Sequence, residues 1–178
     1  MQGVVLRAYK TGQWREISVN GLSRKNILEK AKELCSFRSL SKSRVKLRKL
    51  KPWKLDSEIP VTIKPSDVDI EEKLENVRRV YNDAVGCDKK IVNATVTYAD
   101  STLERTFVNT EGSLLRQVIP RASVFVVPVA KESGKMEYDY LGRGGTVGFE
   151  LLKALDEKTV KKTVDSSIEL LKSSSAPS

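Results

Sequence analysis

The 178-residue sequence contains no histidine and only two cysteines. Histidine is the commonest general base and metal ligand, so its absence excludes Ser-His-Asp and Cys-His nucleophile systems within this chain. Cys35 and Cys87 are isolated, without a CxxC pair, as is typical of buried thiols in a reducing compartment. A zinc site would have to combine them with carboxylates, which is rare. We therefore predict no catalytic, metal-binding or cofactor-binding residue in this chain.

Long apolar runs and a targeting signal are also missing. No apolar stretch approaches the roughly 20 residues of a membrane span. Met1 is not followed by the basic and apolar stretches of a signal peptide. Hydrophobic residues make up 39% of the chain and charged residues 31%, which is typical of a globular protein. We expect a cytoplasmic protein that has no membrane partner.

The first third of the chain predicts a hairpin, a helix and a basic segment. Gly3–Tyr9 and Gln13–Asn20 are extended runs around the turn "KTG". Ser23 is a good N-cap for a helix that runs from Arg24 to near Ser36. Trp14 and Trp53 are most simply core or interface residues.

The segment 37–54 contains eight basic residues and no acidic one, in a chain whose net charge is +9. Such a balance favours an acidic partner. Val45 and Leu47 alternate with basic residues, as in a lysine-protected edge strand. The alternative is a nucleic-acid-binding module, which usually interleaves more aromatic residues than are found here. Its phosphate contacts would be Arg44, Lys46, Arg48, Lys49 and Lys51.

The middle of the chain predicts a helix between extended segments. "LDSEIPVTIKPSD" reads as an extended connection, and Ser66 opens a helix that ends at Gly86. The predicted apolar face of this helix is Ile70, Leu74, Val77, Tyr81 and Val85.

Short strands then favour an antiparallel meander. The run Ala122–Ala130 is apolar on both faces, which indicates a central strand that something must cover on each side. Pro128 cannot donate a ladder hydrogen bond, so we expect a bulge or a strand end there. The other predicted strands are Ile91–Tyr98, Leu103–Asn109, Leu114–Ile119 and Lys135–Leu141.

Two helices, Phe149–Leu155 and Val160–Leu171, complete the predicted fold. The second has an apolar stripe of Val160, Val164, Ile168 and Leu171. We predict one α+β domain, an antiparallel sheet meander with flanking helices, over residues 1–172. Subregions of 1–64 and 65–172 are compatible with this pattern, and residues 173–178 read as a polar tail or linker.

Four glycines occur within "GRGGTVG", Gly142 to Gly148, between a strand-like and a helix-like run. A dinucleotide fingerprint requires G-x-G-x-x-G, and here the third glycine comes one position late; the Walker lysine is also missing. We therefore interpret these glycines as a way for the chain to leave a sheet and approach a helix closely.

The order of these segments resembles the N-terminal domain of the TldD/PmbA family, the "modulator of DNA gyrase" metallopeptidases. "GVVLRAYKTGQWREISVNGLSRKNILEKA" is similar to the family's first strands and helix entry. "NATVTYADSTLERTFVNTEG" and "RASVFVVPVAKESGKMEYDYLGRGG" resemble its long strand pairs and its glycine-rich exit into a helix.

The resemblance implies a non-catalytic part of a zinc peptidase. Family members continue into a domain with an H-E-x-x-x-H helix and a later cysteine, and no such motif occurs here. It implies a fragment, a split gene product or a degenerate paralogue, inactive alone, with zinc only in a separate catalytic domain. The implied partners are further copies of the chain or a catalytic subunit, and unfolded peptides bound as added strands.

Overall fold

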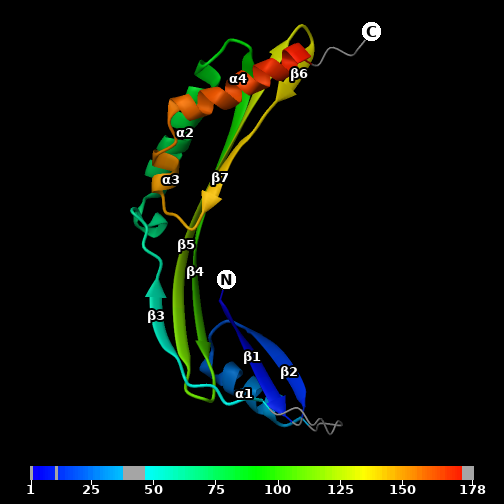
Figure 1. The fold of residues 1–178 in the computed structure, drawn as a ribbon, viewed down its shortest axis with the longest axis vertical. Coiled ribbons are helices and arrows are strands. Elements are labelled where there is room, and N and C mark those ends of the chain that lie inside the picture. The colour runs from blue at the N-terminus through cyan, green and yellow to red at the C-terminus, as the bar shows by residue number, and fades with distance from the viewer. Residues whose placement is uncertain (1, 11, 38–46, 174–178) are drawn as a thin grey trace. The chain divides into compact units, whose positions relative to one another are not determined.

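The computed structural model describes residues 2–10, 12–37 and 47–173, and it consists of two compact units, Met1–Leu50 and Lys51–Ser178 (Figure 1). Each unit combines strands with at least one helix, and each is described by itself below. The α+β class predicted from the sequence is confirmed.

The first unit is a β-hairpin with one helix. Strands β1 (Gly3–Lys10) and β2 (Gln13–Asn20) pair antiparallel, and Gly12 adopts a φ of 86° at the turn between them. Such a positive φ is strained for residues that carry a Cβ. Helix α1 (Arg24–Cys35) follows Ser23, whose side chain makes no capping hydrogen bond. The predicted hairpin and helix are confirmed. Their small core consists of Val19, Leu34 and Phe37.

The second unit is built on two long antiparallel strands, β4 (Ile91–Val108) and β5 (Leu114–Glu132). Their ladder runs from the pair Ile91–Ala130 to the pair Val108–Leu114. The side chain of Asn109 closes the turn, because its Oδ1 accepts the N–H groups of Glu111 and Ser113 at 3.2 and 2.9 Å. Figure 1 shows these strands as the longest elements of the unit.

Three shorter strands share the second edge of β5. β3 (Lys54–Glu58) pairs parallel with Leu114–Val118, whereas the other two pair antiparallel. β7 (Leu141–Gly145) lies beside Ala122–Val126, and β6 (Lys135–Tyr138) lies beside Val129–Glu132. The sheet is therefore antiparallel except for β3.

The predicted breaks within the long strands are wrong. "ADST" continues β4, and Pro120 and Pro128 both lie inside β5. Both prolines fall where the second edge of β5 has no partner, between β3 and β7 and between β7 and β6. A nitrogen directed to such an edge loses no ladder hydrogen bond. The expected bulge lies instead in β4, between Ile91 and Asn93. The predicted strand Lys135–Leu141 is divided between β6 and β7.

Helices α2 (Ile70–Gly86), α3 (Glu150–Lys153) and α4 (Glu157–Ser173) pack on one face of the ladder (Figure 1). The predicted stripe of α4 is confirmed, because all four of its residues are buried. The core also contains Phe149, whose ring meets that of Tyr98 edge-on at 5.7 Å. Its other members include Val80, Ala84, Val124, Val126, Leu152, Val160 and Val164.

The predicted apolar face of α2 is confirmed only at Val77 and Val85, which are partly buried against the core. Ile70 is 61% exposed and Leu74 47% exposed, whereas Val80 and Ala84 are buried. The helix begins at Ile70, after a 3-10 turn at Pro65–Asp67, and not at Ser66. The face that meets the sheet is thus offset from the stripe read from the sequence.

Three further predictions require correction. Val45 lies outside the described residues, and Leu47 lies in no strand; the strand in this region is β3, within the stretch predicted as a connection. Trp14 and Trp53 are 62% and 70% exposed and so are not core residues. Three of the four glycines lie within or at the end of β7, where Gly142 and Gly144 closely approach β5, and Gly148 brings the chain close to Ile63 just before α3.

Candidate functional site

Strand β4 forms an open edge of the sheet. It pairs only with β5, and within the described part of the second unit no strand lies along its other side. An 18-residue strand is about 60 Å long. Proteins usually protect such edges with lysine, proline or bulges, whereas β4 contains neither lysine nor proline and one bulge near its start. Its backbone N–H and C=O groups are therefore available to a further strand.

The two faces of the ladder differ because side chains alternate along a strand. One face, with the cross-strand pairs Tyr98–Val124 and Val96–Val126, lies under the helices. The opposite face, which we call the open face, consists of the odd-numbered residues from Asn93 to Phe107 and from Leu115 to Val129. Phe125 is 48% exposed there, and Val127 and Val129 are half-buried. Ala122–Ala130 is thus apolar on both faces, and helices of this unit cover one.

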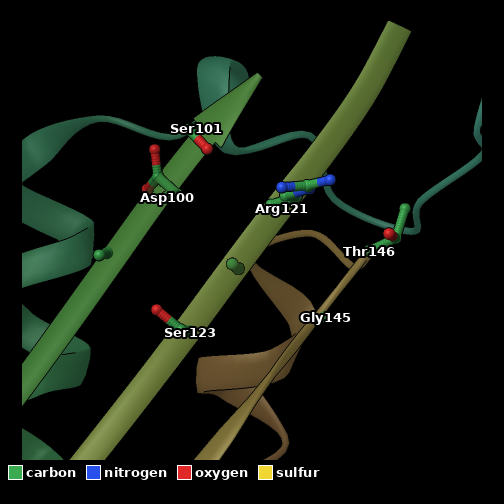
Figure 2. Close-up of a pocket in the computed structure, with 8 residues that line it drawn as sticks. Asp100, Ser101, Arg121, Ser123, Gly145 and Thr146 are labelled. Atoms are coloured by element: carbon green, nitrogen blue, oxygen red, sulfur yellow. The ribbon is translucent and has the colours of Figure 1, made fainter. Parts of the chain in front are cut away.

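A hollow of about 650 Å³ lies midway along the ladder, where β5 passes from β3 to β7 (Figure 2). Its polar side chains are the Arg121 guanidinium, the Asp100 carboxylate, which is ion-paired with Lys73 at 2.8 Å, and several hydroxyls. The guanidinium and the hydroxyls can bind a carboxylate or a peptide backbone, whereas the one carboxylate is held in its ion pair with Lys73. The residues around it are Ala99, Asp100, Ser101, Arg121, Ala122, Ser123, Gly145 and Thr146.

Glu150 connects the start of α3 to the segment that follows β3. Its carboxylate accepts the backbone N–H groups of Gly148 at 3.0 Å, Ile63 at 2.9 Å and Thr62 at 3.3 Å. The Phe149 N–H donates to the Ile63 carbonyl at 2.9 Å. These bonds hold two segments that are 87 positions apart in sequence.

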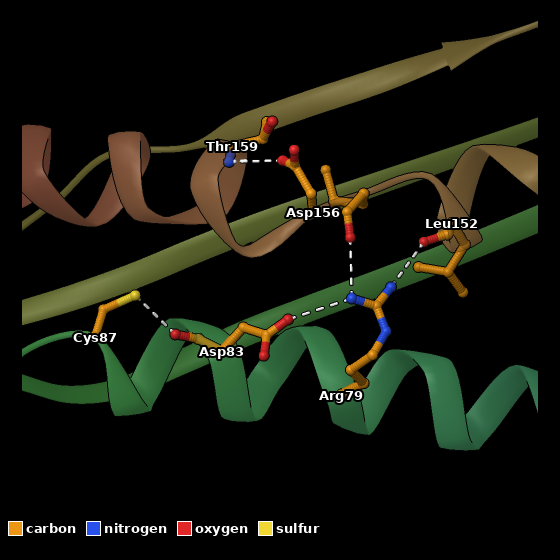
Figure 3. Close-up of polar contacts among 7 residues, drawn as sticks. Arg79, Asp83, Cys87, Leu152, Asp156 and Thr159 are labelled. Carbon is orange, nitrogen blue, oxygen red and sulfur yellow. Dashed lines mark hydrogen bonds and ion pairs between the residues drawn. The ribbon is translucent and has the colours of Figure 1, made fainter.

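Arg79 performs a similar role on α2 (Figure 3). Its guanidinium donates to the carbonyl oxygens of Leu155 at 3.0 Å and Leu152 at 3.1 Å, and it forms an ion pair with Asp83 at 3.3 Å. The Leu155 carbonyl lies just after α3, and the Leu152 carbonyl at its end also accepts the Leu155 N–H at 3.3 Å. Arg79 therefore couples α2 to α3 and helps to keep the helices on one face of the sheet.

We predict that Glu150→Gln destabilises the protein by about 1 kcal/mol at pH 7, a value that allows for solvent screening. Burial raises the pKa of Glu150, but the N–H donors of Gly148, Ile63 and Thr62 outweigh it and hold the pKa below its ordinary 4.5. A depressed folded-state pKa stabilises the protein above 4.5, and this contribution is lost as the pH falls through the folded-state value. Urea denaturation from pH 7 to pH 3 should show that the difference in free energy of unfolding between wild type and Glu150→Gln shrinks below pH 4.5. A difference that does not depend on pH would contradict this role of Glu150.

The predicted nucleic-acid contacts are only partly described. Arg44 and Lys46 lie outside the described residues, and Arg48, Lys49 and Lys51 are exposed in a segment that is neither helix nor strand. Cys35 is exposed. Cys87 is half-buried and its thiol donates to the Asp83 carbonyl at 2.9 Å; burial raises its pKa, which leaves little thiolate at neutral pH.

The donor set does not fit a zinc site. The sequence has no histidine, and the described residues bring together no group of three or more cysteine, aspartate and glutamate side chains that could hold a metal. No helix among those residues is both long and apolar enough to span a bilayer. The open edge and the open face are the extended surfaces that suit binding, and the sequence could not show that β4 is the open edge because this depends on which strands pair.

Residues 63–167 match the sequence profile of the PmbA/TldA metallopeptidase central domain. This chain belongs to that family. The resemblance to TldD/PmbA proteins is thereby confirmed, although the matched profile describes the central domain whereas the resemblance was to the N-terminal one. A metalloprotease of Methanocaldococcus jannaschii is 31% identical over 98% of this chain and 39% of its own length. One from Methanothermobacter thermautotrophicus is 36% identical over 64% of this chain and 25% of its own.

Solved structures show the same fold. A protein from Thermotoga maritima, described as a modulator of DNA gyrase, has a TM-score of 0.73 at 16% identity and is matched over 98% of this chain and 39% of its own. TldE from Thermococcus kodakarensis has a TM-score of 0.60 at 15% identity, over 94% and 37%. The chain thus spans about two fifths of the length of these solved structures. It spans 39% of one metalloprotease and 25% of the other.

Proposed function

We propose that this PmbA/TldA family chain is the non-catalytic part of a zinc metallopeptidase, which forms the peptide-binding cleft and contacts the catalytic part. The observation that carries the proposal is the 18-residue open edge of β4 in a family chain that has no histidine and whose described residues gather no metal-ligand cluster.

Zinc would come from a separate domain. The two metalloproteases are more than twice as long as this chain, which leaves most of their length for other domains. A tetrahedral zinc site with a water-activating base needs ligands that this chain lacks. We therefore assign to this chain binding and orientation of the substrate, without bond cleavage.

Unfolded peptides are the substrates that suit the edge of β4. An extended peptide can add to an exposed strand through main-chain hydrogen bonds, while flanking side chains provide specificity. Every residue from Ala99 to Gly112 is exposed, so this part of the edge is accessible.

The open face of the ladder suits a subunit contact. It exposes Leu103 and Phe107 near one end and Phe125 further along, and exposed apolar side chains of this size suit an interface. The partner that fits is a catalytic polypeptide of the same family or a further copy of this chain.

Assembly can be tested by light scattering across a concentration series, with and without a family polypeptide that carries the H-E-x-x-x-H helix. We expect one complex that melts at a higher temperature than either part, because binding only the folded state stabilises it. A chain that stays monomeric at all concentrations and does not bind the partner would contradict the proposed subunit contact.

The purified chain should contain no stoichiometric zinc and should not hydrolyse unfolded peptides. Elemental analysis is the check, with a peptide-hydrolysis assay beside it. About one tightly bound zinc per chain would overturn this prediction, because Cys35 and Cys87 would then have to be ligands.

A second candidate function is nucleic-acid binding, which the charge distribution favours. Residues 1–50 contain 13 basic and 3 acidic residues, whereas residues 51–178 contain 19 and 20. The basic charge is thus concentrated in the first unit. A salt titration separates the candidates: binding that nearly vanishes at physiological salt reflects a solvated basic surface, and sub-micromolar, sequence-dependent binding there would favour this second function.

A further inference from the structure

The open edge of β4 carries a specific side-chain pattern near its end. Leu103, Arg105 and Phe107 alternate on the open face, where Leu103 is 38% and Phe107 50% exposed. Their cross-strand partners on β5 are Ile119, Gln117 and Leu115. Two apolar side chains therefore flank one cation along the edge.

Arg105 has no carboxylate to neutralise it. Its cross-strand partner is Gln117, and it forms no ion pair with any residue that the structure describes. By contrast, Arg116 binds Glu104 at 2.8 Å and Asp56 at 3.1 Å. Glu104 and Asp56 lie on the same face of the ladder as Arg116, because side chains of paired residues share a face. Arg105 follows Glu104 directly and so lies on the opposite face, away from both carboxylates.

We propose that the edge of β4 selects extended peptides in which an acidic residue stands between two apolar residues at alternate positions. This inference rests on the proposed function, in which a peptide pairs with β4. Side chains directly opposite each other on neighbouring strands approach to about 5 Å, so the peptide would place its apolar, acidic and apolar groups beside Leu103, Arg105 and Phe107. The pattern reads the same in both directions, so it holds for parallel and antiparallel pairing.

The same charge argues against a second copy of β4 as the occupant. Two copies paired antiparallel about Arg105 would place their guanidinium groups opposite each other, and like charges in that position are destabilising. An acidic peptide neutralises Arg105, whereas self-pairing doubles the unpaired charge.

The test uses the full chain and a fluorescein-labelled peptide, Thr-Thr-Leu-Thr-Glu-Thr-Leu-Thr-Thr, with its termini blocked. Its matched control has lysine in place of glutamate. We expect fluorescence anisotropy to show the glutamate peptide binding roughly five- to tenfold more tightly, as attraction is exchanged for repulsion at a cross-strand pair. Alternate N-methylation of the glutamate peptide should abolish binding, because it removes the N–H groups that pair with the edge.

Charge reversal on the protein makes the test specific. Arg105→Glu should invert the preference, and Arg105→Gln should abolish it. Arg78→Glu, the same charge change at an exposed site on α2, should leave it unchanged. Thermal melts confirm that each variant is folded.

Equal binding of the two peptides, or an unchanged ranking with Arg105→Glu, would overturn the specificity and leave the peptide-binding edge intact. Failure to bind either peptide would overturn both the specificity and the edge. Tight binding of the N-methylated peptide would show surface adsorption and would likewise contradict strand addition.

Discussion

Gly148→Ala should lower the free energy of unfolding by roughly 3 kcal/mol or more. A Cβ at this position would penetrate the carbonyl oxygen of Ile63 and would lie 2.5 Å from the Glu150 carboxylate. The first of these is a backbone atom that already accepts the Phe149 N–H at 2.9 Å, so it cannot move away without breaking that bond. Urea denaturation followed by circular dichroism measures the loss.

Gly145→Ala is the matched control. It lies three positions earlier, and a Cβ there would meet no atom within 4 Å. We expect a change within about 0.5 kcal/mol. If both variants were equally mild, the close approach between Gly148 and Ile63 would not be part of the folded state.

Arg79→Ala should cost about 2 kcal/mol. It removes two hydrogen bonds from a charged group, and it leaves the Leu155 carbonyl without its Arg79 donor while the Leu152 carbonyl keeps the Leu155 N–H. Arg79→Lys should recover about half of this loss, because an ammonium group cannot reach both carbonyls as a planar fork does. Both effects can be read from urea denaturation midpoints at pH 7.

The neighbouring Arg78 provides the comparison for this series. It is exposed and forms no hydrogen bond or ion pair with α3 among the described residues, so Arg78→Ala should change stability by no more than about 0.5 kcal/mol. An Arg79→Ala variant as stable as Arg78→Ala would mean that the bonds between α2 and α3 contribute nothing measurable.

The sequence predicted correctly those elements that depend on residues close to one another in the sequence. The stripe of α4 is regular over three turns, so its buried face could be read directly from the sequence. The hairpin β1–β2 also depends on a short turn. The offset of α2 could not be read, because Ile70 and Leu74 are apolar residues that the tertiary fold leaves exposed.

The features that the sequence did not predict depend on pairing between strands that are far apart in the sequence. "ADST" and Pro120 are typical of turns, but each lies in a strand whose partner is supplied by a distant segment. The parallel pairing of β3 with β5 joins residues 60 positions apart, as in the ion pair of Asp56 with Arg116. The family resemblance implied that peptides add as strands to a sheet edge, but that β4 supplies the open edge follows from this topology and was found only once the strands were placed.

The most direct test of the proposed function is peptide hydrolysis by a zinc-loaded family polypeptide that carries the H-E-x-x-x-H helix, titrated with this chain. We predict that hydrolysis of an unfolded peptide rises with added chain and saturates near one chain per catalytic polypeptide. The chain alone should give no hydrolysis. Hydrolysis that stays unchanged across the titration, or that the chain performs alone, would contradict its role as the peptide-binding, non-catalytic part of the peptidase.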